Sequence, residues 1–205
     1  QAKANGTTEV NNVNPTPVAK PAAKKVIDDA LKAKNDAIDA NNDLTAEEKA
    51  KAKEDAKAKA DAAKQAIDNA TTNDAVTQAK ANGTTEVNNV NPTPVAKPAA
   101  KKAIDDALKA KNDAIDANND LTAEEKAAAK QEAQDKADAA KQAIDNATTN
   151  ATVEQAKANG TTEVNNVNPT PVVKPAAKKA VEDALKAKEA EIDARDDLTA
   201  EEKTA

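Results

Sequence analysis

Apolar residues recur along the chain at the spacing expected of helices that bury one face. A stripe in the second copy of a repeated pattern consists of Ile104, Leu108, Lys111 and Ile115, widened by Ala100, Ala103, Ala107 and Ala114. Steps of three and four residues place side chains on one face of a helix. We therefore predict a helix that begins at Pro98, because proline is favoured at a first helical position, and that ends near Asn118 and Asn119.

A second helix is predicted directly after this one. Thr122 can cap it while Glu125 reaches back, and the same pairs occur at Thr45/Glu48 and Thr199/Glu202. The helix runs to about Ala147. Its inner seam is made almost entirely of small residues, Ala129, Ala133, Ala137 and Ala140, followed by Ile144. Such a seam lets neighbouring backbones approach closely.

A third helix follows, with Asn150 as its candidate cap. Its buried face is expected to carry Val153, Gly160, Val164 and Val167. Asn159-Gly160 leaves two alternatives open, a tight hairpin turn or a short break at the glycine. We favour a continuous helix, because the glycine falls on the buried stripe, where a missing side chain admits another helix.

The pattern repeats along the chain. The string QAKANGTTEVNNVNPTPV begins at Gln1, Gln78 and Gln155, a period of 77 residues. The first two copies differ at nine positions, and five of these lie between Lys51 and Ala58. All 9 prolines fall in three copies of one short segment, and its N-P-T-P-V part cannot be helical and serves as a stiff linker.

These elements predict an all-α protein, a tandem array of small up-down-up three-helix bundles joined by proline-containing linkers. Residues 1–19 would hold the last helix of a preceding repeat and a linker, 20–96 and 97–173 complete repeats with linkers, and 174–205 a truncated repeat. An odd number of helices places the two ends of a bundle apart, so we expect an elongated, monomeric rod.

Composition makes any core thin and excludes most chemistry. Among the 205 residues, 52 are Ala and only 27 are Val, Ile or Leu, and there is no aromatic residue, Met, Cys, His or Ser. Without Cys there is neither a disulfide nor a thiolate metal site. No apolar run of about 18 residues predicts a membrane span, and no signal peptide is visible.

Catalytic and cofactor sites are not expected. The commonest catalytic base is missing because there is no His, and the carboxylate pairs Asp105-Asp106 and Glu124-Glu125 point apart on a solvated helix face. Each repeat has a single glycine, so no glycine-rich phosphate loop exists. We interpret the chain as a non-enzyme with no cofactor.

The end of the first helix matches a calcium-binding loop only in part. Asp39, Asn41 and Asp43 match the first, third and fifth positions of an EF-hand loop, but Leu44 stands at the sixth and Ala50 at the twelfth. The third position becomes Arg195 in the last copy. We read the segment as a polar helix end and expect no metal.

Charge also argues against nucleic acid as a partner. The net charge is -6, with 30 basic and 36 acidic residues interspersed, and no aromatic side chain is available for base stacking. The lysine pairs Lys24-Lys25, Lys101-Lys102 and Lys178-Lys179 are predicted to lie on a solvated first turn, balanced by aspartates three or four residues on.

Several motifs together resemble a known family. The P-x-x-K-K-x-I-D-x-A-L helix, the L-T-x-E-E-K capping box, the K-Q-A-I-D-N-A-T-T-N junction and the A-K-x-x-G helix are similar to the tandem three-helix repeat, a domain of unknown function, of very large Gram-positive cell-wall adhesins, including staphylococcal surface proteins of the Ebh, SasC and FmtB type. The resemblance covers the whole chain.

That resemblance implies an extracellular, wall-attached protein of adhesion, aggregation or biofilm formation, with these repeats as its stalk. It supplies no catalytic residue. The leading hypothesis is a mechanical spacer that projects a binding region. The parent protein that contains the repeats would contact host matrix or serum proteins or other cells. The alternative is that the bundle faces themselves bind a host or matrix protein. A third interpretation, a disordered desiccation-type protein, predicts little helix.

Overall fold

The computed structural model describes residues 1–11 and 18–204, and every regular element in them is a helix. They form two compact units, residues 1–97 with 148–150 (unit 1) and residues 98–147 with 151–205 (unit 2). The first linker copy, with Pro15 and Pro17, lies outside the described residues. The predicted all-α class is confirmed, and the disordered alternative is wrong.

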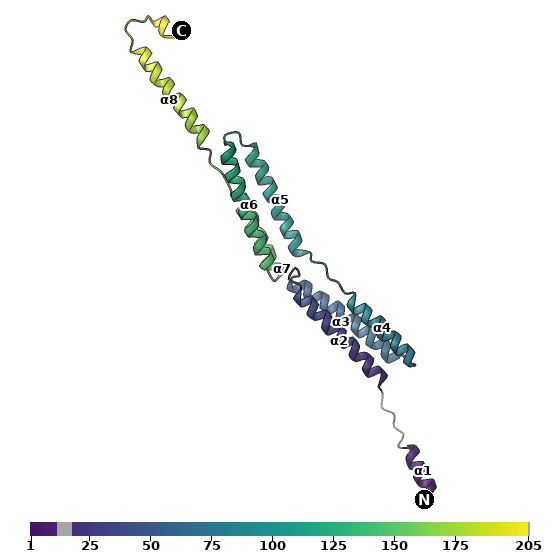
Figure 1. Cartoon of the computed structure of the whole chain (residues 1–205). Helices are drawn as coiled ribbons and strands as arrows, with labels where there is room; N and C mark the ends of the chain where they lie inside the picture. The colour runs from purple at the N-terminus through teal and green to yellow at the C-terminus, as the bar shows by residue number, and fades with distance from the viewer. Residues whose placement is uncertain (12–17, 205) are drawn as a thin grey trace. The chain divides into compact units, whose positions relative to one another are not determined.

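In unit 1 a short helix, α1 (Ala2–Asn11), precedes a three-helix bundle. The bundle consists of α2 (Ala19–Ala40), α3 (Ala46–Asn69) and α4 (Asn73–Asn88), and each of these helices contacts the other two (Figure 1). The connections are only a few residues long, so neighbouring helices run antiparallel. This is the predicted up-down-up bundle.

Unit 2 repeats the arrangement. Its helices are α5 (Ala96–Ala117), α6 (Ala123–Asn146), α7 (Asn150–Asn165), α8 (Val173–Asp193) and α9 (Ala200–Thr204). Helices α5, α6 and α7 meet around Gly160, which lies against Ala140 and Ile104, as α2, α3 and α4 meet around Gly83. The helices α8 and α9 follow as the beginning of another copy.

The core of each bundle matches the predicted stripes. On α6, all four seam alanines and Ile144 are buried, and on α5 so are Ala100, Ile104, Leu108 and Ile115. One prediction for this stripe is wrong, because Ala114 is exposed. The helix turns this position outward, and half-buried Lys111 and Asn112 complete the inner face instead.

The third helix runs without a break through its glycine, so the hairpin and the helix break are both excluded. The buried face of α7 carries Val153, Gly160 and Val164. A Cβ built on Gly160 would lie 2.3 Å from the Cβ of Ala140 on α6 and 2.9 Å from Cδ1 of Ile104 on α5. The glycine therefore sits at a close approach of the three helices, as the pattern predicts.

Helix ends are where the sequence predictions need correction. Both helix-forming capping boxes are present, Thr45 with Glu48 and Thr122 with Glu125, and the same two hydrogen bonds join Thr199 and Glu202. Asn150, however, is the first residue of α7. At the equivalent site of α4, Thr72 is the cap and its hydroxyl accepts from Ala75 N–H, so the cap lies one residue earlier than expected.

Two further boundaries differ from the prediction. The helix expected to begin at Pro98 begins two residues earlier, at Ala96, which places the proline at the third helical position. Proline is tolerated there because first-turn N–H groups have no partner within the helix. Val167 lies two residues beyond the end of α7, yet it is buried. The core therefore extends into the start of the linker.

Candidate functional site

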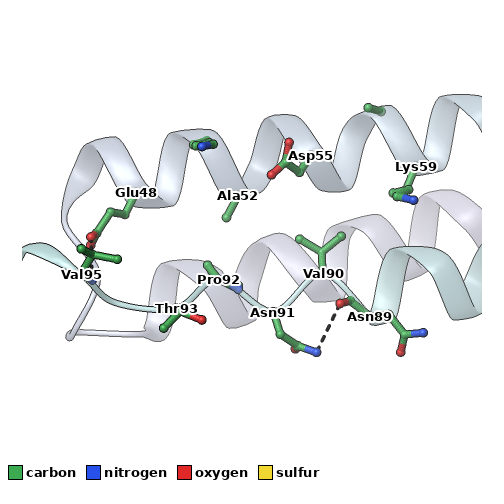
Figure 2. A pocket seen from close by; sticks show the side chains of 12 residues that line it. Glu48, Ala52, Asp55, Lys59, Asn89, Val90, Asn91, Pro92, Thr93 and Val95 are labelled. Atoms are coloured by element: carbon green, nitrogen blue, oxygen red, sulfur yellow. Dashed lines mark hydrogen bonds between the residues drawn. The ribbon is translucent and has the colours of Figure 1, made fainter.

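A groove on unit 1 runs between α3 and the linker after α4, and has a volume of about 560 Å³. Its lining includes Glu48, Lys51, Ala52, Asp55, Ala58 and Lys59 on α3 and residues 89–93 and Val95 on the other wall. Figure 2 shows Ala52 and Asp55 facing the linker across it. The sequence pattern does not predict this groove, because no periodicity links α3 to an extended segment about 40 residues away.

The chemistry of this groove belongs to one copy of the repeat. Lys51, Asp55 and Ala58 line it, and all three are among the positions that differ between copies. The corresponding residues of unit 2 are Ala128, Glu132 and Asp135. A ligand that recognised the charges of one groove would meet a different set in the other. The groove is therefore a poor candidate for a site common to both repeats.

Each unit also has a groove between its second and third helices. It measures about 450 Å³ between α3 and α4, and about 240 Å³ between α6 and α7. Alanines and the buried glycine form its floor, and an ion pair edges it, Lys59 with Glu86 at 2.8 Å and Lys136 with Glu163 at 3.0 Å. This groove results from the close approach of small residues and holds no reactive group.

The carboxylate pairs considered for acid-base chemistry are engaged in opposite directions. Asp105 pairs with Lys141 on α6, whereas its neighbour Asp106 pairs with Lys102 one turn earlier on α5, at 2.8 Å. Glu125 is the capping-box partner of Thr122. The two aspartates are thus held by different partners, and Glu125 is held in a helix cap, so these three carboxylates act as structural groups.

The calcium-like segment is also structural. The carboxylate of Asp39 pairs with Lys53 on α3 at 2.5 Å, and Asn41 Oδ1 accepts the backbone N–H of Asp43 at 2.9 Å, which closes a turn. In the described part of the chain, no group of three or more acidic, His or Cys side chains is arranged to hold a metal ion.

The lysine pairs of the first helix divide between two kinds of contact. The second lysine of each pair binds the aspartate four residues on, in Lys25–Asp29, Lys102–Asp106 and Lys179–Asp183. In the bundles, the first lysine crosses to the second helix, Lys24 to Asp68 and Lys101 to Asp145. The expected pairing of lysine and aspartate charges within one helix is confirmed for one lysine of each pair. The ion pairs between the first and second helices were not predicted from the sequence.

Among the residues that the structure describes, no helix combines the length and the apolar character needed to cross a bilayer.

Comparison with known proteins gives a family match over most of the chain. Residues 19–95 and 96–172 each match DUF1542, described as a Domain of Unknown Function. The two matches are adjacent, and each spans one three-helix bundle and its linker. No solved structure matches the chain.

Similar curated proteins come from Staphylococcus aureus. The chain is 32% identical over 205 residues, its whole length, to "Extracellular matrix-binding protein EbhA" of strain N315, of which it covers 3%. It is 32% identical over the same length to "Extracellular matrix-binding protein ebh" of strain JH9, of which it covers 2%. The chain thus spans only a few per cent of the length of these relatives.

Proposed function

Because the chain belongs to the DUF1542 family, we propose that its bundles are non-catalytic spacer repeats in the stalk of an extracellular surface protein attached to the cell wall. In this role the repeats act as a monomeric array that projects a binding region of the parent protein. They need no cofactor, and they contact neither nucleic acid nor the inside of a membrane.

The observation that carries this proposal is the distribution of differences between the two copies. The residues that pack the helices are the same in both copies, including the four seam alanines, the glycine and its neighbouring isoleucine. The differences gather on the outer part of α3 and α6, between positions 51 and 58 of the first copy. A spacer has to preserve its packing and is indifferent to its outer surface.

The alternative function is that the bundles themselves bind a matrix protein. It is favoured by the relatives, which are named "Extracellular matrix-binding protein". Under this alternative, the groove between α3 and the linker after α4 is the first surface to examine, since it measures about 560 Å³ and has charged residues at its edge.

Solid-phase binding separates the two functions. The chain is applied to wells coated with individual matrix and serum proteins, with albumin-coated wells as the blank. A matched variant carries the residues of positions 128, 131, 132, 134 and 135 at positions 51, 54, 55, 57 and 58. The spacer role predicts no saturable binding by either chain. Saturable binding that the exchange abolishes would contradict it and assign binding to the groove.

A further inference from the structure

The first helix of each repeat begins without a capping side chain of its own. The N-cap of α8 is Val172 and that of α2 is Val18, and neither makes a side-chain cap hydrogen bond. Valine is among the poorest N-cap residues because it has no acceptor for the free N–H groups of the first turn. These donors are therefore left to water or to an acceptor elsewhere in the molecule.

In unit 2 the acceptor comes from the preceding bundle. One carboxylate oxygen of Glu125, Oε2, accepts the backbone N–H of Thr122 at 2.8 Å and so completes the capping box of α6. The other, Oε1, accepts the backbone N–H groups of Val172 at 2.9 Å and of Val173 at 3.1 Å. A single side chain therefore caps two helices that begin about 50 residues apart.

The same contacts occur independently in unit 1. Glu48 Oε2 accepts from Thr45 N–H at 2.9 Å, and its Oε1 accepts from Val95 N–H at 3.0 Å and Ala96 N–H at 3.1 Å. Figure 2 shows Glu48 beside Val95 at the end of the linker. Hydrogen bonds to a charged acceptor are stronger than those between neutral groups.

A lysine adds a second attachment at the same place. Lys97 Nζ donates to the backbone carbonyl of Asn42 in unit 1, and Lys174 Nζ donates to that of Asn119 in unit 2, both at 2.8 Å. These carbonyls lie in the loop between the first and second helices. The residues that follow the prolines are thus held by a carboxylate and by a loop carbonyl of the bundle that they leave.

We propose that Glu48 and Glu125 are shared caps that fasten the end of each linker to its own bundle, with Lys97 and Lys174 as auxiliary ties. This inference deepens the proposed spacer role. Proline alone stiffens the middle of a linker, whereas the shared cap restrains its last residues and starts the next helix. Each repeat then depends on its predecessor for the cap of its first helix.

Replacing Glu125 with Gln tests this role. A glutamine has one acceptor oxygen, so it can retain the bond to Thr122 N–H but cannot also accept from Val172 and Val173. Amide hydrogen exchange by NMR on the whole chain is expected to become about tenfold faster or more at Val172 and Val173. Exchange within the bundle core stays unchanged. Equal exchange rates at both valines in the variant and the parent chain would overturn the proposal.

Glu202→Gln is the matched control. Glu202 accepts from Thr199 N–H at 2.9 Å, and among the described residues it meets no linker amide. This variant is expected to leave Val172 and Val173 unaffected.

If Glu125→Gln also loosens the start of α6, the variant Lys174→Met tests the attachment of the linker instead, because it leaves the capping box of α6 intact. Faster exchange at Val173 and residue 174 supports the shared attachment, and no change there overturns it. The binding assay for the spacer role does not depend on either outcome.

Discussion

Gly83 shows how one missing methyl group permits the packing of a bundle. A Cβ at this position would lie 2.3 Å from the Cβ of Ala63 and 3.0 Å from Cδ1 of Ile27. The first distance is far below van der Waals contact between carbons, and the Cβ of Ala63 is fixed to its helix backbone, whereas Cδ1 of Ile27 is the end of a side chain. The α3 and α4 backbones would have to move apart to admit an alanine.

We therefore predict that Gly83→Ala destabilises unit 1. Overpacking costs about 1–3 kcal/mol, and the better helix propensity of alanine offsets about 1 kcal/mol of it, so a net loss of up to about 2 kcal/mol is expected. Urea denaturation followed by circular dichroism measures it. A second substitution, Ala63→Gly, should recover part of the loss because it removes the closer of the two clashing atoms.

Gly6→Ala is the matched control for this prediction. Gly6 lies in α1, in the same sequence context, but a Cβ there has no neighbour within 4 Å. Only the propensity gain applies, so the variant should be neutral or slightly more stable than the parent chain. Equal effects of the two substitutions would show that packing is not what places glycine in the third helix.

Acid should release the shared cap. Hydrogen bonds from the N–H groups of Thr122, Val172 and Val173 lower the pKa of Glu125. For Glu48, burial raises the pKa, but bonds from Thr45, Ala96 and Val95 together outweigh it and the net shift is downward. A carboxylate with a lowered folded-state pKa stabilises the fold above its unfolded pKa, and this stabilisation is lost as the pH falls through the folded value.

We predict that protection of the Val172 and Val173 amides declines as the pH falls below about 4.3, the ordinary pKa of a glutamate. Titration of the Glu125 carboxyl carbon by NMR should give a midpoint below that value. In Glu125→Gln, protection of the two amides should no longer depend on pH in this range. A midpoint at the ordinary value would contradict the prediction.

At the scale of the helix, the small-residue seam determines how closely α6 approaches its neighbours. Ala133 is fully buried in this seam, whereas Ala128, on the same helix, is exposed and is replaced by Lys51 in the other copy. We predict that Ala133→Leu destabilises unit 2 by about 1–3 kcal/mol through overpacking.

Ala128→Leu is the control, and it should change stability by no more than about 0.5 kcal/mol, since it alters an exposed surface. Both variants keep a strong helix former, so propensity is held constant. Thermal or urea unfolding monitored at 222 nm distinguishes them. Similar stabilities for the two leucine variants would mean that the seam is loosely packed.

The helices could be predicted because the sequence patterns that specify each helix lie within that helix. The three-and-four spacing, the Thr122/Glu125 capping box and the seam ending at Ile144 each lie within one helix, where side-chain direction follows from position. The resemblance to a repeat family agreed with these patterns. The continuous helix through Gly160 was predicted for the reason the structure shows, a close approach of backbones.

What could not be predicted depends on contacts between distant segments. Residue spacing does not show that the second carboxylate oxygen of Glu125 accepts from Val172 N–H. Nor does it show that α8 begins at Val173, which places Pro175 at the third helical position. The choice between Thr72 and Asn73 as the cap of α4 is similar, because both residue types are good caps and tertiary geometry decides between neighbours.

At the scale of the whole molecule, the spacer role turns on how length accumulates with repeat number. Within a bundle of three antiparallel helices, the chain enters at one end and leaves at the other. The second helix of unit 2 has 24 residues, which at about 1.5 Å per residue gives about 36 Å for one bundle. Linkers add to this value.

We predict that the maximum dimension in solution grows linearly with copy number, by about 36 Å or more for each added repeat. Small-angle X-ray scattering on this chain, and on chains extended by one and two further 77-residue copies, measures that slope. Light scattering on the same samples checks that each chain is a monomer, because association end to end would also increase length. A dimension that rises only as the cube root of mass would mean that the bundles fold back on one another, and a stalk built from them could not project a binding region.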